Sequence, residues 1–277
     1  MKDLNEIAKE LQAVVDRCED RYDTNCEGYR DLIIRAALYY MDAMFPSYCN
    51  HPETSGYGED IRAHYLKAAN DCLFNALKHT TTEAEAKIVV EALCAKTPQI
   101  MEYLVTDIRA GYEGDPAAKS VDEIILAYPA YLAISIFRIA HELYLLGQPL
   151  IARLMTEYAH RKTGIDIHPG ATIGKSFFID HGTGVVIGET TVIGENVKLY
   201  QHVTLGAKSF SVAPDGSLVK GIKRHPNIGN NVVIYSGATI LGGDVYIGDN
   251  AVVGGNVWLT HSLGAGETIY FNPEKTC

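Results

Sequence analysis

An aspartate and a histidine stand side by side at Asp180-His181, in a stretch of otherwise small and β-branched residues. Histidine is the side chain that exchanges a proton near neutral pH. A carboxylate on its second ring nitrogen fixes the tautomer and stabilises the imidazolium. Asp166 lies fifteen residues before His181. These residues could carry out general-base chemistry, with His181 as the base and Asp166 as the carboxylate that orients it; the alternative is a structural histidine.

A second set of polar residues could hold a charged substrate. Arg224 carries a planar guanidinium that can bind a carboxylate with two hydrogen bonds, and His225 follows it directly. Asp115 and Asp180 can accept hydrogen bonds from an ammonium group. Structural roles remain as alternatives: Arg224 as a solvated loop charge, and Asp115 as part of a Gly-Asp-Pro turn.

The element that must position most of these residues has a period of six. A six-residue repeat is typical of a β-helix, in which each side of a prism points one aliphatic residue inward and three sides make a coil of eighteen residues. An antiparallel sandwich would instead show alternation broken by turns every eight to twelve residues. The aliphatic residues form four series: Ile167, Ile173, Ile179; Ile187, Ile193, Leu199, Leu205; Ile228, Ile234, Ile240; and Ile247, Val253, Leu259.

The series are interrupted at three places. Two additional residues lie around 182–184, and a slip of one residue falls at Gly242-Gly243. A long basic segment, 207–223, is expected to be extruded from the coil. A separation of fifteen residues is three short of a full coil, so the bulge at 182–184, or a partner subunit, must bring Asp166 and His181 together.

The first part of the chain follows a helical period instead. Leu4, Ile7, Leu11 and Val14 fall on one face of a first helix. Further helices are predicted near 28–46, 58–79, 82–95, 97–112, 120–146 and 148–162. The predicted organisation is therefore α+β: an all-helical assembly domain over 1–162, followed by a β-helix domain over 163–277 that carries the catalytic residues.

Composition excludes several classes of function. The net charge of −10 argues against a nucleic-acid or membrane-surface role. The first residues lack a signal-peptide pattern, and the longest apolar run is interrupted by Pro129. The six cysteines form no C-x-x-C pair and are typical of reduced thiols. A cytoplasmic protein without membrane or nucleic-acid partners is expected.

Seven short motifs lie along the two parts of the chain: Asp107-Ile108-Arg109-Ala110, Gly114-Asp115-Pro116-Ala117-Ala118, Asp166-Ile167-His168-Pro169-Gly170-Ala171, Asp180-His181-Gly182-Thr183-Gly184, Val186-Ile187-Gly188-Glu189-Thr190, Val203-Thr204-Leu205-Gly206 and Lys223-Arg224-His225-Pro226. Together they resemble the serine O-acetyltransferase family of hexapeptide-repeat acyltransferases. The resemblance covers roughly residues 100 to 260 and implies a left-handed β-helix, a handedness that the period alone does not give.

The resemblance implies transfer of an acetyl group from acetyl-CoA to the hydroxyl of L-serine, which gives O-acetyl-L-serine for cysteine biosynthesis. It assigns His181 and Asp166 as the catalytic pair. An alcohol is a poor nucleophile at neutral pH, so this reaction requires such a base. The residues that it implies for holding the amino acid are Asp115, Asp180, Arg224 and His225.

The resemblance also implies a groove for acetyl-CoA at Gly206, Ser236, Gly237 and Gly254. Ala207 stands where the family usually has a second glycine. A homo-oligomer is implied, either a trimer or a dimer of trimers, with L-cysteine as a feedback inhibitor. The chain does not end in isoleucine, so a stable complex with O-acetylserine sulfhydrylase is not expected.

Other functions remain as alternatives. A zinc triad of His181, His202 and His225 would parallel β-helical carbonic anhydrases, but their His-x-x-x-x-His pair does not occur here. No metal is therefore expected, and His168 and His202 are expected to be coil or interface residues. The chain could instead acetylate homoserine, a sugar or an antibiotic, or be a non-catalytic β-helical scaffold. The residues suited to an amino-acid head group argue against another acceptor, and intact Asp166 and His181 argue against a scaffold.

Overall fold

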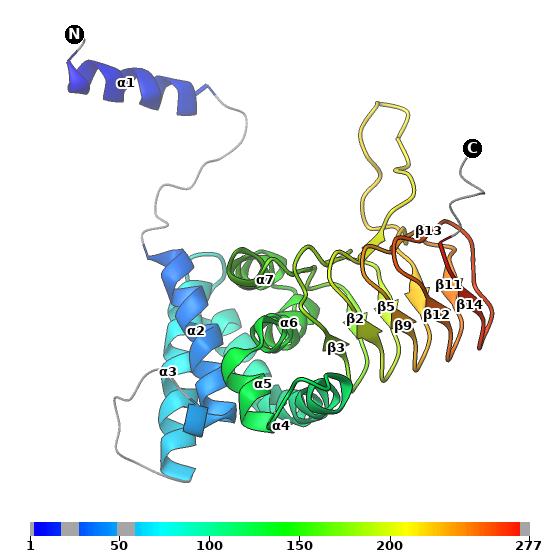
Figure 1. Ribbon diagram of the computed structural model, residues 1–277. Helices are drawn as coiled ribbons and strands as arrows, with labels where there is room; N and C mark the ends of the chain where they lie inside the picture. The colour runs from blue at the N-terminus through cyan, green and yellow to red at the C-terminus, as the bar shows by residue number, and fades with distance from the viewer. Residues whose placement is uncertain (1–2, 18–27, 49–58, 272–277) are drawn as a thin grey trace.

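A computed structural model describes residues 3–17, 28–48 and 59–271. Cys18, Cys26, Cys49 and Cys277 lie outside these ranges; Cys72 and Cys94 are free thiols. A helical region precedes a prism of short strands (Figure 1). The helices are α1 (Leu4–Val15), α2 (Tyr29–Met44), the 3-10 helix η1 (Pro46–Tyr48), α3 (Glu59–Leu77), α4 (Glu83–Gly114), α5 (Val121–Ala127), α6 (Pro129–Leu145) and α7 (Pro149–Thr163).

The strands form three parallel sheets, one on each side of the prism. Sheet 1 has the order β1-β4-β7-β10-β13, sheet 2 has β11-β8-β5-β2 and sheet 3 has β14-β12-β9-β6-β3. The chain visits the three sheets in turn. The strands are β1 (Asp166–Ile167), β2 (Thr172–Ile173), β3 (Phe178–Ile179), β4 (Val186–Ile187), β5 (Val192–Ile193), β6 (Lys198–Leu199), β7 (Thr204–Gly206), β8 (Asn227–Ile228), β9 (Val233–Ile234), β10 (Thr239–Leu241), β11 (Tyr246–Ile247), β12 (Val252–Val253), β13 (Trp258–Leu259) and β14 (Thr268–Ile269).

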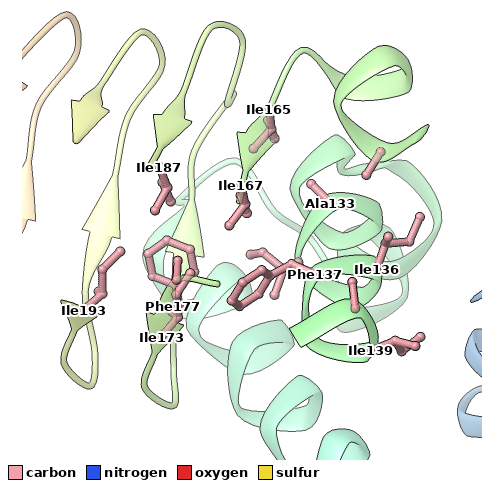
Figure 2. Close-up of a cluster of buried hydrophobic side chains, with 14 of the residues drawn as sticks. Ala133, Ile136, Phe137, Ile139, Ile165, Ile167, Ile173, Phe177, Ile187 and Ile193 are labelled. Carbon is pink, nitrogen blue, oxygen red and sulfur yellow. The ribbon is translucent and has the colours of Figure 1, made fainter. Parts of the chain in front are cut away.

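The predicted helical region followed by a parallel β-helix is confirmed. Every aliphatic residue of the four predicted series is at most 5% exposed and lies inside the prism. Ile167, Ile173, Ile187 and Ile193 continue into the core between the first coils and helix α6, where Phe137 packs (Figure 2). The prism therefore shares one apolar core with helices α2, α3, α4, α6 and α7.

The breaks in the six-residue frame appear in the strand pairing. Asp166 pairs with Val186, so the first coil spans 20 residues. Val186 pairs with Thr204, which gives the standard 18 residues. Thr239 pairs with Trp258, a coil of 19 residues. The two additional residues of the first coil and the single additional residue near Gly242 are thus confirmed.

The segment after β7 leaves the prism as a hairpin, which projects from the coils in Figure 1. Val212 and Leu218 form an antiparallel bridge, and the backbone N–H of Ala213 donates to Ser217 at 2.8 Å. Its turn, Pro214-Asp215-Gly216, has the composition expected of a tight turn.

Two helix predictions were wrong at prolines. Helix α4 runs unbroken through Pro98, where two helices were expected, because buried neighbours such as Leu93 and Ile100 hold it on both sides. The predicted helix 120–146 is instead divided at Tyr128, which is extended because Pro129 disfavours a helical residue before it. No single described helix is long and apolar enough to cross a membrane; α5 and α6 pass that test only as a pair bent by 77°.

A buried ion pair joins the helices to the first coil. Arg138 of α6 donates two hydrogen bonds to Asp107 of α4 at 2.7 and 2.9 Å. The same guanidinium reaches the carbonyls of Ile173 and Gly174, and Asp107 accepts from the backbone N–H of Phe177 at 2.9 Å. The aspartate of the Asp107-Ile108-Arg109-Ala110 motif is therefore a structural residue that fixes α4 on the prism.

Candidate active site

His181 lies at the corner of the first coil where the chain passes from sheet 3 to sheet 1. Its backbone is left-handed, with φ of 57°, and its side chain is 71% exposed. The other non-glycine residues in this conformation are mostly asparagines, which adopt it readily. The corner turns the His181 ring out of the coil. A ring buried in the aliphatic core, or lying flat on the sheet, would be less accessible to a substrate.

Two carboxylates, Asp115 and Asp180, lie near this histidine. With their neighbours they make up what we call the first cluster, which comprises Asp115, Tyr128, Asp180, His181 and Lys198. Asp180 is only 8% exposed, and its Oδ1 lies 4.0 Å from Nε2 of His181. Its other oxygen lies 3.3 Å from Nζ of Lys198. The first cluster thus has a buried carboxylate directly behind an exposed imidazole.

Asp115 reaches the first cluster from the C-terminal end of α4. Tyr128 donates its hydroxyl to Asp115 at 2.5 Å, and the backbone N–H of Ala117 donates to the same carboxylate at 2.8 Å. These hydrogen bonds lower the pKa of Asp115, and the charges of Lys198 and His181 act in the same direction. In return, Asp115 raises the pKa of Tyr128 to about 12. Asp115 therefore forms the turn that its sequence suggested and also carries a negative charge beside His181.

The second cluster lies at the corner of the prism where the chain leaves sheet 1 for sheet 2. His181 lies at the other corner of sheet 1, where the chain arrives from sheet 3, and we call these two corners the edges of sheet 1. It comprises Tyr144, Glu189, Thr190, Arg224 and His225. The Arg224 guanidinium pairs with Glu189 at 2.5 Å, and Tyr144 donates to the other Glu189 oxygen at 2.9 Å. Burial acts to raise the pKa of Glu189, but these hydrogen bonds outweigh it and the pKa is lowered. Arg224 is thus held by a counter-charge and is three-quarters buried.

His225 is fixed as a neutral hydrogen-bond donor. Its Nδ1 accepts from the backbone N–H of Thr190 at 3.1 Å, so the ring proton is assigned to Nε2. The ring is 7% exposed and lies against Gly188, where an added Cβ would be 2.2 Å from Nε2. Burial and the adjacent Arg224 charge lower the pKa of His225 to about 4. A group with this pKa is a weak base at neutral pH.

Asp166, which was predicted to orient His181, is not paired with it within one chain. Its carboxylate lies 3.9 Å from Arg153 of α7. No hydrogen bond or ion pair joins it to His181, although both residues are described. The nearby ring of His168 has a lowered pKa because of burial and the Arg153 charge. The pairing of Asp166 with His181 therefore stays a prediction.

The residues predicted for the acetyl donor are divided between the two edges of sheet 1. Gly206 ends β7, and Ala207 follows it on the edge of the second cluster. Ser236 and Gly237 follow β9, and Gly254 follows β12. Both strands belong to sheet 3, so these residues lie where the chain passes from sheet 3 to sheet 1, on the His181 edge. At Gly237 an added Cβ would be 2.3 Å from the side chain of Asn256, and at Gly254 it would be 2.9 Å from Tyr270. Close coil stacking alone therefore requires glycine at these two positions.

Among residues 3–17, 28–48 and 59–271, the first cluster borders a cavity of about 350 Å³ only through Tyr128, which is on its rim. This cavity lies among α2, α5 and α6, and His181 and Arg224 do not line it. One group of described residues has metal-ligand geometry, Glu157, His160 and Asp166. Arg153 lies 2.5 Å from Glu157 and 3.9 Å from Asp166, so the group is an ion-pair network with its own cation.

Sequence reasoning missed five residues of these clusters. Glu189 and Thr190 were quoted within a motif but had no role, Tyr128 and Tyr144 were placed inside a continuous helix, and Lys198 was not considered. The only local signal was at Tyr128, which precedes a proline and so had to leave the helix. Nothing local indicates that Lys198, one coil after Phe178, would reach Asp180.

The chain was compared with protein families and with curated proteins. No family model matches it. It is 55% identical over 184 residues to "Serine acetyltransferase, plasmid" of Synechococcus elongatus, an alignment that covers 66% of this chain and 57% of the relative. The chain spans between 54% and 61% of the length of four such curated relatives. It spans 89% of the serine acetyltransferase of Helicobacter pylori, at 44% identity over 58% of this chain.

Solved structures extend the similarity to nearly the whole chain. Entamoeba histolytica serine acetyltransferase 1, in complex with L-cysteine, is 35% identical with a TM-score of 0.80; the match covers 96% of this chain and 97% of that one. Soybean serine acetyltransferase complexed with serine is 32% identical with a TM-score of 0.62, over 91% and 98% of the two chains. This chain belongs to the serine acetyltransferase family.

Proposed function

We propose that this protein transfers the acetyl group of acetyl-CoA to the hydroxyl of L-serine, giving O-acetyl-L-serine and CoA. The observation that carries the proposal is the first cluster, in which an exposed imidazole lies beside two carboxylates. The carboxylates suit a substrate ammonium, and the imidazole suits the serine hydroxyl, whose oxygen is three bonds from the ammonium nitrogen. Relatives whose structures hold serine and L-cysteine support an amino-acid ligand.

His181 acts as the general base. Its free ring nitrogen removes the proton from the serine hydroxyl while the oxygen attacks the thioester carbonyl carbon. A C–O bond forms, and the C–S bond of the thioester then breaks. The CoA thiolate leaves and takes the proton from the imidazolium, which returns His181 to its starting state. Asp166 would orient the ring during this cycle.

Serine is held through both ends of its head group. Asp115 and Asp180 accept hydrogen bonds from the ammonium. Arg224 binds the carboxylate through the guanidinium nitrogens that Glu189 leaves available, since Glu189 pairs with Nη2. His225 donates through Nε2, because its Nδ1 is occupied by Thr190. The carboxylates of the first cluster thus bind the ammonium of serine, and the guanidinium of the second cluster binds its carboxylate.

A complete site requires two copies of the chain. The ammonium-binding and carboxylate-binding clusters lie at opposite edges of sheet 1, as do the two groups of donor residues. Serine is too short to reach from one edge to the other. The first cluster of one copy would therefore meet the second cluster of another in a trimer or a dimer of trimers. L-cysteine, which resembles serine in its head group, would compete for the same site and inhibit the enzyme.

Thiol release from acetyl-CoA tests the proposal, with serine, homoserine and a sugar as parallel acceptors. We expect rapid release with serine only, and mass spectrometry should identify O-acetyl-L-serine. Equal rates with the sugar would favour a broader hydroxyl acetyltransferase. Absence of release with every acceptor, from a protein that binds acetyl-CoA, would favour a non-catalytic scaffold.

A further inference from the structure

We infer that Lys198 is a positioning residue that sets the affinity for the acceptor's ammonium group by holding Asp115 and Asp180 together. The inference rests on the proposed function, which assigns these two carboxylates to the ammonium. It concerns a residue on the second coil that no motif singled out. The evidence is the set of contacts that the Lys198 side-chain ammonium makes.

Lys198 bridges the prism and helix α4. Its Nζ donates to the carbonyl of Gly114 at 2.6 Å and lies 3.3 Å from Oδ2 of Asp180. Gly114 is the last residue of α4, where the unpaired carbonyls carry the negative end of the helix dipole. Asp115 follows directly. Lys198 therefore fixes the backbone that carries one carboxylate against the side chain of the other.

The surroundings of Lys198 leave its ammonium few other positions. The side chain is 19% exposed, and Nζ lies 4.5 Å from the ring centre of Tyr200 and 5.2 Å from that of Phe178. Phe178 in turn fills the space that a side chain at Gly114 would need, since an added Cβ there would be 2.9 Å from the ring. The lysine is thus packed between two aromatic rings and aimed at the carboxylates.

The charge of Lys198 also matters for the ligand. Asp115 and Asp180 together carry two negative charges, and Asp180 is 8% exposed. Without a cation, a buried carboxylate would be desolvated and unpaired in the absence of substrate. With Lys198 the three groups carry a net charge of −1, which one substrate ammonium neutralises. Lys198 therefore leaves the site with the charge that one bound ammonium group neutralises. It has no part in the proton transfer that His181 carries out.

The test compares Lys198→Met, which keeps the length and apolar packing, with Lys198→Arg, which keeps the charge. Lys175→Met is the control, because Lys175 also lies over an aromatic ring, that of Tyr103 at 5.3 Å, but outside the first cluster. We expect Lys198→Met to raise the serine KM by about 10- to 100-fold, the range for a charged partner lost from a desolvated site. The kcat and the acetyl-CoA KM should change less than about threefold. Lys198→Arg should recover most of the serine affinity.

Calorimetric titration of L-serine into each variant gives the same comparison without turnover, and thermal denaturation reports whether each variant folds. A normal serine KM in a folded Lys198→Met variant would overturn the inference. So would equal weakening toward serine and acetyl-CoA, or an Arg variant as impaired as the Met variant. If the wild-type protein does not acetylate serine at all, the proposed function fails, an outcome that is separate from any difference among these variants.

Discussion

The two clusters contain one histidine each, and the two histidines have opposite environments. His181 is 71% exposed on a left-handed corner, with a carboxylate 4.0 Å away. His225 is 7% exposed, accepts from Thr190 and has a pKa lowered to about 4. The same side chain is therefore placed to accept a proton from a ligand at one edge of sheet 1 and to donate a hydrogen bond to a ligand, through Nε2, at the other. Burial and the occupancy of the ring nitrogens decide which role each histidine can take.

The surrounding charges differ in the same way. The first cluster combines two carboxylates with Lys198, so its excess charge is negative and suits an ammonium. The second cluster presents Arg224, held by a single carboxylate, next to a neutral imidazole. It suits a carboxylate ligand. One chain therefore carries an anionic cluster at one edge of sheet 1 and a cluster with a paired guanidinium at the other, and the following variants test the proposed division of the substrate between them.

The largest effect is expected for His181→Ala. Loss of a positioned general base should lower kcat by about 10²- to 10⁴-fold with little change in either KM. Steady-state thiol release at saturating substrates measures this. His225, whose pKa is lowered to about 4, is a weak base at neutral pH, so it should substitute poorly. A variant that keeps more than about a tenth of the wild-type kcat would contradict the assignment of the base and the contrast between the two histidines.

The next effect is expected for Arg224→Ala. The serine KM should rise by about 100-fold, because a partly buried carboxylate loses a charged hydrogen-bond partner worth about 3 kcal/mol. The acetyl-CoA KM should stay close to that of the wild type. Arg161→Ala, which removes a guanidinium beside Tyr158 on α7, is the matched control. Equal weakening toward both substrates would instead assign Arg224 to the phosphates of CoA.

The buried state of His225 predicts a pH dependence of stability. Its pKa in the folded protein, about 4, is below the ordinary value of 6.5, so the unfolded chain binds the additional proton between these values. Stability from this group is present above pH 6.5 and is lost as the pH falls toward 4. Lowering the pH from 7 to 5 should cost about 1–2 kcal/mol.

Denaturant unfolding at the two pH values measures this cost. His225→Asn keeps a hydrogen-bond acceptor near Thr190 but cannot be protonated, so its unfolding free energy should change less over the same range. An identical pH response in wild type and variant would show that His225 is not held neutral by burial.

The smallest effect is expected for Asp166→Ala. If Asp166 orients His181, kcat should fall by about tenfold, less than for His181→Ala, because the base itself remains. Asp166 lies beside Arg153, so Arg153→Ala distinguishes a general loss of the ion pair from a loss of orientation. A decrease in kcat that is equal in both variants would assign Asp166 to the α7 contact instead of to His181.

The helical region, the β-helix, its breaks in register and the residues that line the prism could all be predicted from the amino-acid sequence. These features depend on local spacing: a six-residue period states which side chains point inward, and an insertion of two residues must leave the coil wherever it occurs. The motif residues at the corners, including Asp180, His181 and Arg224, were named from the resemblance of their motifs to a known family, because the period alone marks only where the coil is interrupted. Prolines were a weaker guide, since Pro98 lies inside a helix that its packed neighbours stabilise while Pro129 ends one.

Which of these residues contact one another depends on how the helices fold against the prism. The docking of α4 on Phe178 brings Gly114 and Asp115 to Lys198 and Asp180, and the bend at Tyr128 brings a hydroxyl to Asp115. The same structure leaves Asp166 beside Arg153 and divides the charged residues between two edges of sheet 1. These contacts join residues up to 84 positions apart in the chain, and no local period encodes the distance between them. Their positions follow from how the helices pack on the coils, which depends on the whole shared core.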